Sequence, residues 1–152
     1  MNFNQLTWGV KASFRRYVAS AEGTITLSDG AAQADDGAFI FFAEAGGDFA
    51  IAANGTASGS MRFQGTVTFE AHGGMLKVAV SGLGIEAGEE GLVLTAPEGP
   101  LNQRRCAIAE LGPVESGVGG VVTIASQITI DGMYQIADNY PPGTALDPLI
   151  LA

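Results

Sequence analysis

From Glu22 onward the chain is a succession of short β-branched and aromatic runs, and this pattern constrains the fold more than any other feature. Glycine-containing pairs separate the runs, as expected for turns between short strands. The sequence therefore predicts an all-β fold with a single helix before Glu22. The runs are GTITLS, GAFIFFAEA, DFAIAA, RFQGTVTFEAH, MLKVAVSGL, GLVLTA, RRCAIAEL, GVVTIASQITI and LDPLILA, and the turn pairs are Asp29-Gly30, Asp36-Gly37, Gly46-Gly47, Gly73-Gly74 and Asp131-Gly132.

Residues 62–72 form the clearest predicted strand. Apolar and polar positions alternate there with the period of two expected of a sheet with one packed face. His72 ends this strand on the polar face. Gly73 and Gly74 can adopt positive φ at little steric cost, so we predict a tight hairpin into the run that begins at Met75. The packed positions are Phe63, Gly65, Val67, Phe69 and Ala71.

The segment WGVKASFRRYV, residues 8–18, has a convincing helical period. With about 100° of rotation per residue, its large apolar and aromatic side chains share one face. Ser13 and Arg16 lie on one edge of this apolar stripe, and Lys11 and Arg15 lie on the opposite flank. Tyr17 is therefore predicted at the border of a buried face, beside polar neighbours. The apolar face consists of Val10, Phe14, Tyr17 and Val18.

Length and charge limit the classes of protein to which the chain can belong. Its 152 residues fit one domain, residues 1–152, which can bury roughly 70% of the surface exposed by the unfolded chain. The net charge is −9 and basic clusters are small, which excludes a nucleic-acid partner. No apolar run approaches the roughly 18 residues of a membrane span, and the N-terminus lacks the layout of a secretion signal. We expect a soluble chain whose cellular location the sequence leaves open.

The sequence lacks the common enzymatic motifs. With one His, one Cys and no Cys-x-x-Cys or His-x-x-x-His spacing, a zinc site is disfavoured. No Gly-x-Ser-x-Gly elbow is present, and the stretch SGLGIEAGEEG lacks the Lys of a phosphate loop. Cys106 lies in the apolar run CAIAEL, which indicates a buried thiol. Residue types alone leave Tyr17 either a core tyrosine or a ligand-binding one, and His72 either solvent-facing or functional.

Three motifs, in order along nearly the whole chain, resemble the HtaA domain family, the haem-binding modules of actinobacterial haem-uptake systems. The motifs are LTWGVKASFRRYV, FQGTVTFEAHGGML and YPPGTALDPL. The resemblance implies the family's architecture, a two-sheet antiparallel β-sandwich-like domain, here with one short N-terminal α-helix. It also implies an export route to the cell envelope, whereas the chain as given shows no targeting element, so a cytoplasmic location stays open as well.

The resemblance assigns roles to individual positions. The family's axial ligand of ferric haem falls on Tyr17, its propionate-binding serine on Ser13, and the histidine that hydrogen-bonds the ligating oxygen on His72. An aromatic residue also lines the family's haem pocket from the C-terminal part, and its candidates here are Met133, Tyr134 and Ile136, with no Phe among them. To these we add Arg16 as a propionate contact, because it shares the flank of Ser13 and can donate charge-assisted hydrogen bonds.

These residue types suit ferric haem b. Iron(III) is a hard cation and phenolate a hard oxygen donor, so tyrosine ligation favours the ferric state. Free tyrosine has a pKa near 10, so a hydrogen bond and the charge of the iron are needed to hold a phenolate at neutral pH. An outer-shell histidine also fixes the orientation of the ligating ring.

We therefore predict a haem-binding protein for haem acquisition or transport, without enzymatic activity. Other haem-relay proteins are its expected partners, and two haem-binding faces could meet in a homodimer. Two alternatives stay open at this point. One is a haem-free β-sandwich that serves as an interaction or ligand-binding module. The other is a peroxidase-like haem enzyme, since tyrosinate ligation also occurs in catalase.

Overall fold

The computed structural model describes residues 3–98, 104–136 and 139–152. Within these ranges the chain is mostly β, which confirms the predicted class. The elements are β1 (Gln5–Trp8), α1 (Ala12–Ser20), β2 (Thr24–Ser28), β3 (Ala32–Gln33), β4 (Phe39–Ala43), β5 (Ala50–Ile51), β6 (Ala57–Ser58), β7 (Ser60–Gln64), β8 (Thr66–Ala71), β9 (Leu76–Ser81), β10 (Gly84–Gly88), β11 (Gly91–Pro97), β12 (Arg105–Ser116), β13 (Val122–Ile128), α2 (Ile130–Gln135) and β14 (Ala145–Leu151), with 3-10 turns at His72–Gly74 and Val118–Gly120.

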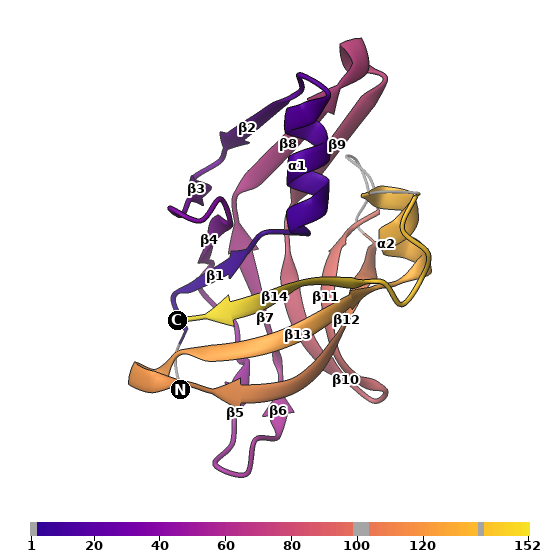
Figure 1. The fold of residues 1–152 in the computed structure, drawn as a ribbon. Helices are drawn as coiled ribbons and strands as arrows, with labels where there is room; N and C mark the ends of the chain where they lie inside the picture. The colour runs from indigo at the N-terminus through magenta and orange to yellow at the C-terminus, as the bar shows by residue number, and fades with distance from the viewer. Residues whose placement is uncertain (1–2, 99–103, 137–138) are drawn as a thin grey trace.

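The strands form two main antiparallel sheets (Figure 1). In the larger one the order is β1-β14-β13-β12-β11-β10-β7-β4-β3, and β4 pairs also with β1, so this sheet closes on itself. We call it the closed sheet. The small sheet consists of β2, β8 and β9, and α1 packs against it. Leu6 shows how closure is built, since it lies opposite Leu151 on one side and Phe41 on the other.

The predicted strand 62–72 divides between the two sheets. Phe63 belongs to β7 in the closed sheet, whereas Val67 and Phe69 belong to β8 in the small sheet. The break is at Gly65, whose φ of 128° is accessible mainly to glycine and whose added Cβ would lie 3.0 Å from the Phe41 ring. The predicted alternation is confirmed, because these apolar positions are buried. The predicted hairpin is confirmed too, since β8 pairs with β9 across the Gly73-Gly74 turn.

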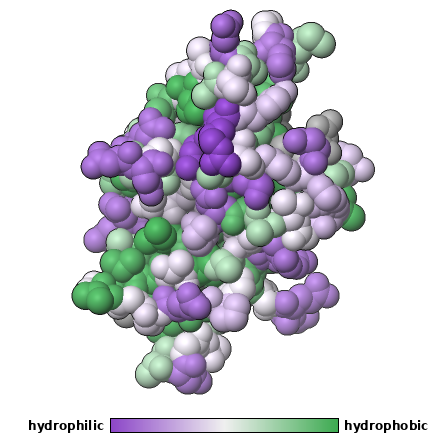
Figure 2. Space-filling view, in the orientation of Figure 1, coloured by the Kyte–Doolittle hydropathy of each residue, from purple (hydrophilic) through white to green (hydrophobic). Residues whose placement is uncertain are grey.

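The first helix is shorter than the predicted segment. Trp8 is the last residue of β1, where it pairs with Phe39, and the helix begins only at Ala12. Strand pairing with a distant segment thus overrides the local helical period. The predicted buried face is correct within the helix, because Phe14 and Val18 are both buried there. In Figure 2 strongly hydrophilic side chains gather over the outward face of α1.

A second helix, α2, was not predicted. It has six residues, too few for an apolar period to be visible in the sequence. Its start is nevertheless well formed, because the Thr129 hydroxyl accepts a hydrogen bond from the backbone N–H of Gly132 at 2.9 Å. None of the helices in the described ranges is long and apolar enough to cross a membrane.

Candidate functional site

Tyr17 and His72 meet although they are 55 positions apart in the chain. The Tyr17 hydroxyl and the His72 Nε2 atom are 2.6 Å apart, which is a short hydrogen bond. Tyr17 comes from α1 and is 46% exposed, and His72 comes from the turn after β8. The structure thus brings together, at the protein surface, the two residues on which the sequence analysis depended most.

The backbone of the β8–β9 turn directs His72 towards α1. His72 has a φ of 54° and Gly73 a φ of 67°, so both are in the left-handed region. This conformation is uncommon for a residue with a side chain. Non-glycine residues held there cluster at functional sites, where the surrounding structure maintains the strain.

Tyr17 lines a groove of about 400 Å³, a size within the range of ligand pockets. The start of β9 contributes Leu76 and Val78, and the C-terminal segment contributes Tyr134 and Ile136. Two apolar side chains of the groove are unusually open to solvent, Met75 at 91% and Tyr134 at 75%. The full lining is Phe14, Tyr17, Met75, Leu76, Lys77, Val78, Tyr134, Gln135, Ile136 and Asn139.

Ser13 lies one helical turn before Tyr17 and has an aromatic partner that the sequence analysis missed. Its Oγ atom is 2.9 Å from the hydroxyl oxygen of Tyr140. The ammonium group of Lys11 lies 5.6 Å from the centre of the Tyr140 ring and donates a hydrogen bond to the Ala145 carbonyl. Tyr140 is the first residue of the motif YPPGTALDPL, so the signal that could have identified it was present in the sequence.

The other predicted site residues fall into two groups. Tyr134 and Ile136 line the groove, whereas Met133 is half-buried and packs against the hydrophobic core. Arg16 is exposed on α1 next to Tyr17. Arg15 does not line the groove and instead forms an ion pair with Asp147 at 2.7 Å. Of the predicted flanks, Arg15 and Ser13 lie apart as expected, but Lys11 does not share the flank of Arg15, because it lies over the Tyr140 ring beside Ser13. Gln135 and Asn139 join the groove in addition.

Cys106 is buried, as predicted, and lies behind one wall of the groove. Gln135, which lines the groove, donates a hydrogen bond from Nε2 to the Cys106 Sγ at 2.7 Å. Burial raises the pKa of the Cys106 thiol, and the negative charges of Asp131 and Glu98 raise it further. The thiol is therefore neutral where it accepts the hydrogen bond from Gln135, a residue of the groove wall. Across the described residues, no three or more His, Cys, Asp or Glu side chains gather as a metal cluster would require.

The geometry can be compared with known proteins. A family model described as Htaa matches residues 4–152. The crystal structure of the C-terminal domain of HtaA from Corynebacterium glutamicum is 27% identical, with a TM-score of 0.73, and the alignment covers 98% of this chain and 95% of that one. A search of curated protein sequences gives no match.

Two further structures from the same organism share the fold. The N-terminal domain of HtaA is 22% identical, with a TM-score of 0.75 and coverage of 99% of this chain and 97% of that one. The haem-binding protein HtaB is 17% identical, with a TM-score of 0.71 and coverage of 98% and 91%. At these identities the likeness concerns the fold alone.

Proposed function

The chain belongs to the HtaA family, and we propose that residues 1–152 act as one domain that binds ferric haem b for acquisition or transport. A structural relative, HtaB, is named as a haem-binding protein, which supports this class of ligand. The observation that carries the proposal is the 2.6 Å hydrogen bond between His72 and the hydroxyl of the exposed Tyr17, on the border of a groove that both apolar and polar side chains line.

In this proposal the Tyr17 oxygen is the axial ligand of the iron. Phenolate is a hard donor that suits ferric iron, and His72 can donate a hydrogen bond from Nε2 to that oxygen. The same hydrogen bond limits rotation of the Tyr17 ring, as outer-shell partners of metal ligands do. The exposed position of the pair leaves the oxygen within reach of a ligand that enters from the solvent.

The remaining groove residues suit the two halves of the ligand. Met75, Leu76 and the ring of Tyr134 offer apolar surface for a macrocycle. The hydroxyl groups of Ser13, one helical turn from Tyr17, and of its partner Tyr140 can each rotate to donate a hydrogen bond to a propionate carboxylate. In this proposal Arg16, exposed on the same helix, adds a charge-assisted hydrogen bond to a carboxylate.

The side chains that share the groove with Tyr17 favour haem transport over catalysis. Tyr134 and Ile136, two of the candidates for the pocket residue from the C-terminal part, line the groove, and neither side chain is a carboxylate or an imidazole, the usual groups of acid–base catalysis. His72, the one imidazole of the chain, is engaged with Tyr17. These residues favour binding and release over peroxide chemistry.

The proposal is tested by titrating the purified protein with hemin and following absorbance. We expect saturation at one haem per chain, with a Soret band and the charge-transfer bands of high-spin ferric tyrosinate. Tyr17→Phe removes only the hydroxyl and should lose these bands. Tyr134→Phe is the matched variant, because it removes the other exposed hydroxyl of the groove and should keep them.

Each result discriminates between functions. If Tyr17→Phe gives the wild-type bands, the ligand assignment is wrong. If the wild-type protein shows no saturable binding, the haem-free interaction module replaces the proposal. If the bound form turns over peroxide much faster than free hemin, the protein is instead a peroxidase-like enzyme.

A further inference from the structure

The helix that carries Tyr17 lacks an N-terminal cap of its own. Lys11 occupies the capping position and makes no side-chain cap, and the first turn of α1 contains no acidic residue. The first N–H groups of a helix have no partner within the helix and need one from outside. The carboxylate of Asp147, on β14, provides it: Oδ1 accepts a hydrogen bond from the Ala12 N–H at 3.0 Å, across 135 positions of sequence.

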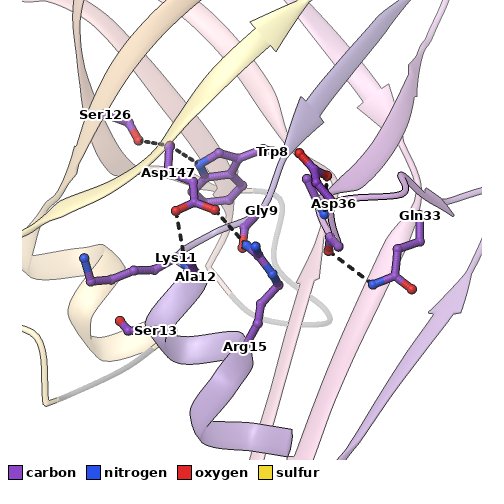
Figure 3. A network of polar contacts seen from close by, with 12 residues as sticks. Trp8, Gly9, Lys11, Ala12, Ser13, Arg15, Gln33, Asp36, Ser126 and Asp147 are labelled. Carbon is purple, nitrogen blue, oxygen red and sulfur yellow. Dashed lines mark hydrogen bonds and ion pairs between the residues drawn. The ribbon is translucent and has the colours of Figure 1, made fainter.

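The Asp147 carboxylate also contacts the first turn of α1 through the side chain of Arg15 (Figure 3). Asp147 Oδ2 accepts a hydrogen bond from Arg15 Nη1 at 2.7 Å, and Arg15 Nη1 donates as well to the Gly9 carbonyl at 2.6 Å. Both side chains are largely shielded from solvent. A negative charge at this end of α1 also interacts favourably with the helix dipole.

The backbone of Asp147 is itself fixed within the closed sheet. Its carbonyl accepts hydrogen bonds from the Trp8 indole and from the Ser126 hydroxyl, both at 2.8 Å. Its N–H donates to the Val10 carbonyl at 2.9 Å. The carboxylate is therefore a rigid attachment point on a strand of the closed sheet, whereas His72 lies in the turn between β8 and β9 of the small sheet.

Gly9 and Val10, which precede α1, pack closely around the contact between Asp147 and Arg15. A Cβ atom on Gly9 would collide with the Arg15 guanidinium and with the Asp147 carboxylate. Val10 has a φ of 62°, a strained value for a β-branched residue. Such strain persists only where neighbouring contacts impose it, and here the hydrogen bond between Asp147 and Val10 does so.

We propose that Asp147 is a positioning residue for Tyr17: its carboxylate fixes the start of α1 against the closed sheet and thereby sets how the Tyr17 hydroxyl meets His72 and the iron. This inference rests on the proposed function. Tyr17 lies five residues after Ala12, about 7.5 Å along the helix axis, so a tilt at the helix start moves the hydroxyl relative to His72.

The test compares Asp147→Ala, Asp147→Asn and Arg15→Gln in the hemin-loaded protein. Asp147→Ala removes both contacts, Asp147→Asn keeps an acceptor for Ala12, and Arg15→Gln breaks the ion pair alone. The readouts are the charge-transfer bands and the rate at which haem passes to excess apo-globin. Asp48→Asn is the matched control, because its carboxylate also accepts a backbone N–H, that of Ser60, in a different loop.

We expect shifted bands and haem release about tenfold faster in Asp147→Ala, a smaller change in Asp147→Asn and Arg15→Gln, and no change in Asp48→Asn. Wild-type bands and release rates in all three variants, even with lowered melting temperatures, would overturn the proposal. If Asp147→Ala does not fold, the other two variants decide by the same criterion. Failure of the proposed function is recognised separately, because Tyr17→Phe would then keep its bands.

Discussion

The ring of Phe14 on α1 packs edge-to-face against the ring of Phe69 on β8, with the two centroids 5.0 Å apart. Phe69 also contacts Phe39 of the closed sheet, at 5.6 Å between centroids. All three rings are buried. Phe69 therefore joins the helix that bears Tyr17 to both sheets, and the groove depends on this aromatic cluster for its shape.

Phe14→Ala should destabilise the protein by about 3–5 kcal/mol, because it removes a fully packed aromatic ring and leaves a cavity under α1. Urea denaturation followed by fluorescence measures the free energy of unfolding. Phe42→Ala is the control, since Phe42 is partly exposed and should cost much less. Equal losses in the two variants would contradict the packing role assigned to Phe14.

His72→Ala and His72→Gly should separate the function of the side chain from the strain of the backbone. Both variants lose the donor to Tyr17, so both should bind haem more weakly and with the same altered spectrum. His72→Gly should be the more stable of the two by about 0.5–1 kcal/mol, because glycine adopts a φ of 54° without steric cost. Thermal melts of the haem-free variants measure that difference, and an Ala variant of equal or greater stability speaks against strain at His72.

Ser13→Ala and Tyr140→Phe should have similar, non-additive effects on haem affinity. Each removes one partner of the 2.9 Å hydrogen bond, which is worth about 0.5–1.5 kcal/mol in typical cases. The double variant should therefore lose less than the sum of the two single losses. Hemin titration of all four proteins provides the cycle, and strict additivity would show that the two hydroxyls act independently.

Cys106 should be inert to thiol reagents in the folded protein at neutral pH. It is buried and its pKa is raised, and both effects reduce the reactive thiolate. Colour formation with a disulfide reagent should appear only on addition of denaturant. Rapid reaction in buffer alone would show that the groove wall formed by Gln135 opens readily.

The same raised pKa predicts a loss of stability at alkaline pH. In the folded state the pKa of Cys106 lies above its ordinary value of 9.0. At pH values between this ordinary pKa and the raised pKa, the folded protein therefore binds more protons than the unfolded chain. The free energy of unfolding should therefore fall as the pH rises through this range. Cys106→Ala should show a flatter dependence there, irrespective of its overall stability, and identical slopes would exclude the thiol as the cause.

Local patterns in the sequence predicted the parts of the fold that local chemistry determines. The alternation around Val67 and Phe69, the glycine hairpin after His72 and the buried face of α1 were all found in this way. The proximity of Tyr17 and His72 was expected only because the motifs resemble a known family. No periodicity relates two residues on different elements.

The features that the sequence analysis missed depend on contacts between distant segments. The pairing of β1 with β4 closes the larger sheet, but β1 lies before the first predicted strand run and its last residue, Trp8, was assigned to the helical segment. The alternating pattern of residues 62–72 divides at Gly65 into β7 of the closed sheet and β8 of the small sheet. This division can be recognised only when the pairing partners of both strands are known. The cap of α1 comes from Asp147, near the other end of the chain, where a search for local capping residues cannot find it.

The groove beside Tyr17 has walls from residues 14 and 17, from 75–78, and from 134–136 together with 139, three parts of the chain that meet only in the folded protein. A denatured chain therefore has no equivalent site, and occupancy of the groove must pull the folding equilibrium towards the native state by mass action. The melting temperature should rise with the logarithm of the free ligand concentration. Thermal stability thus becomes a direct measure of occupancy, for hemin or for any other molecule that the groove accepts.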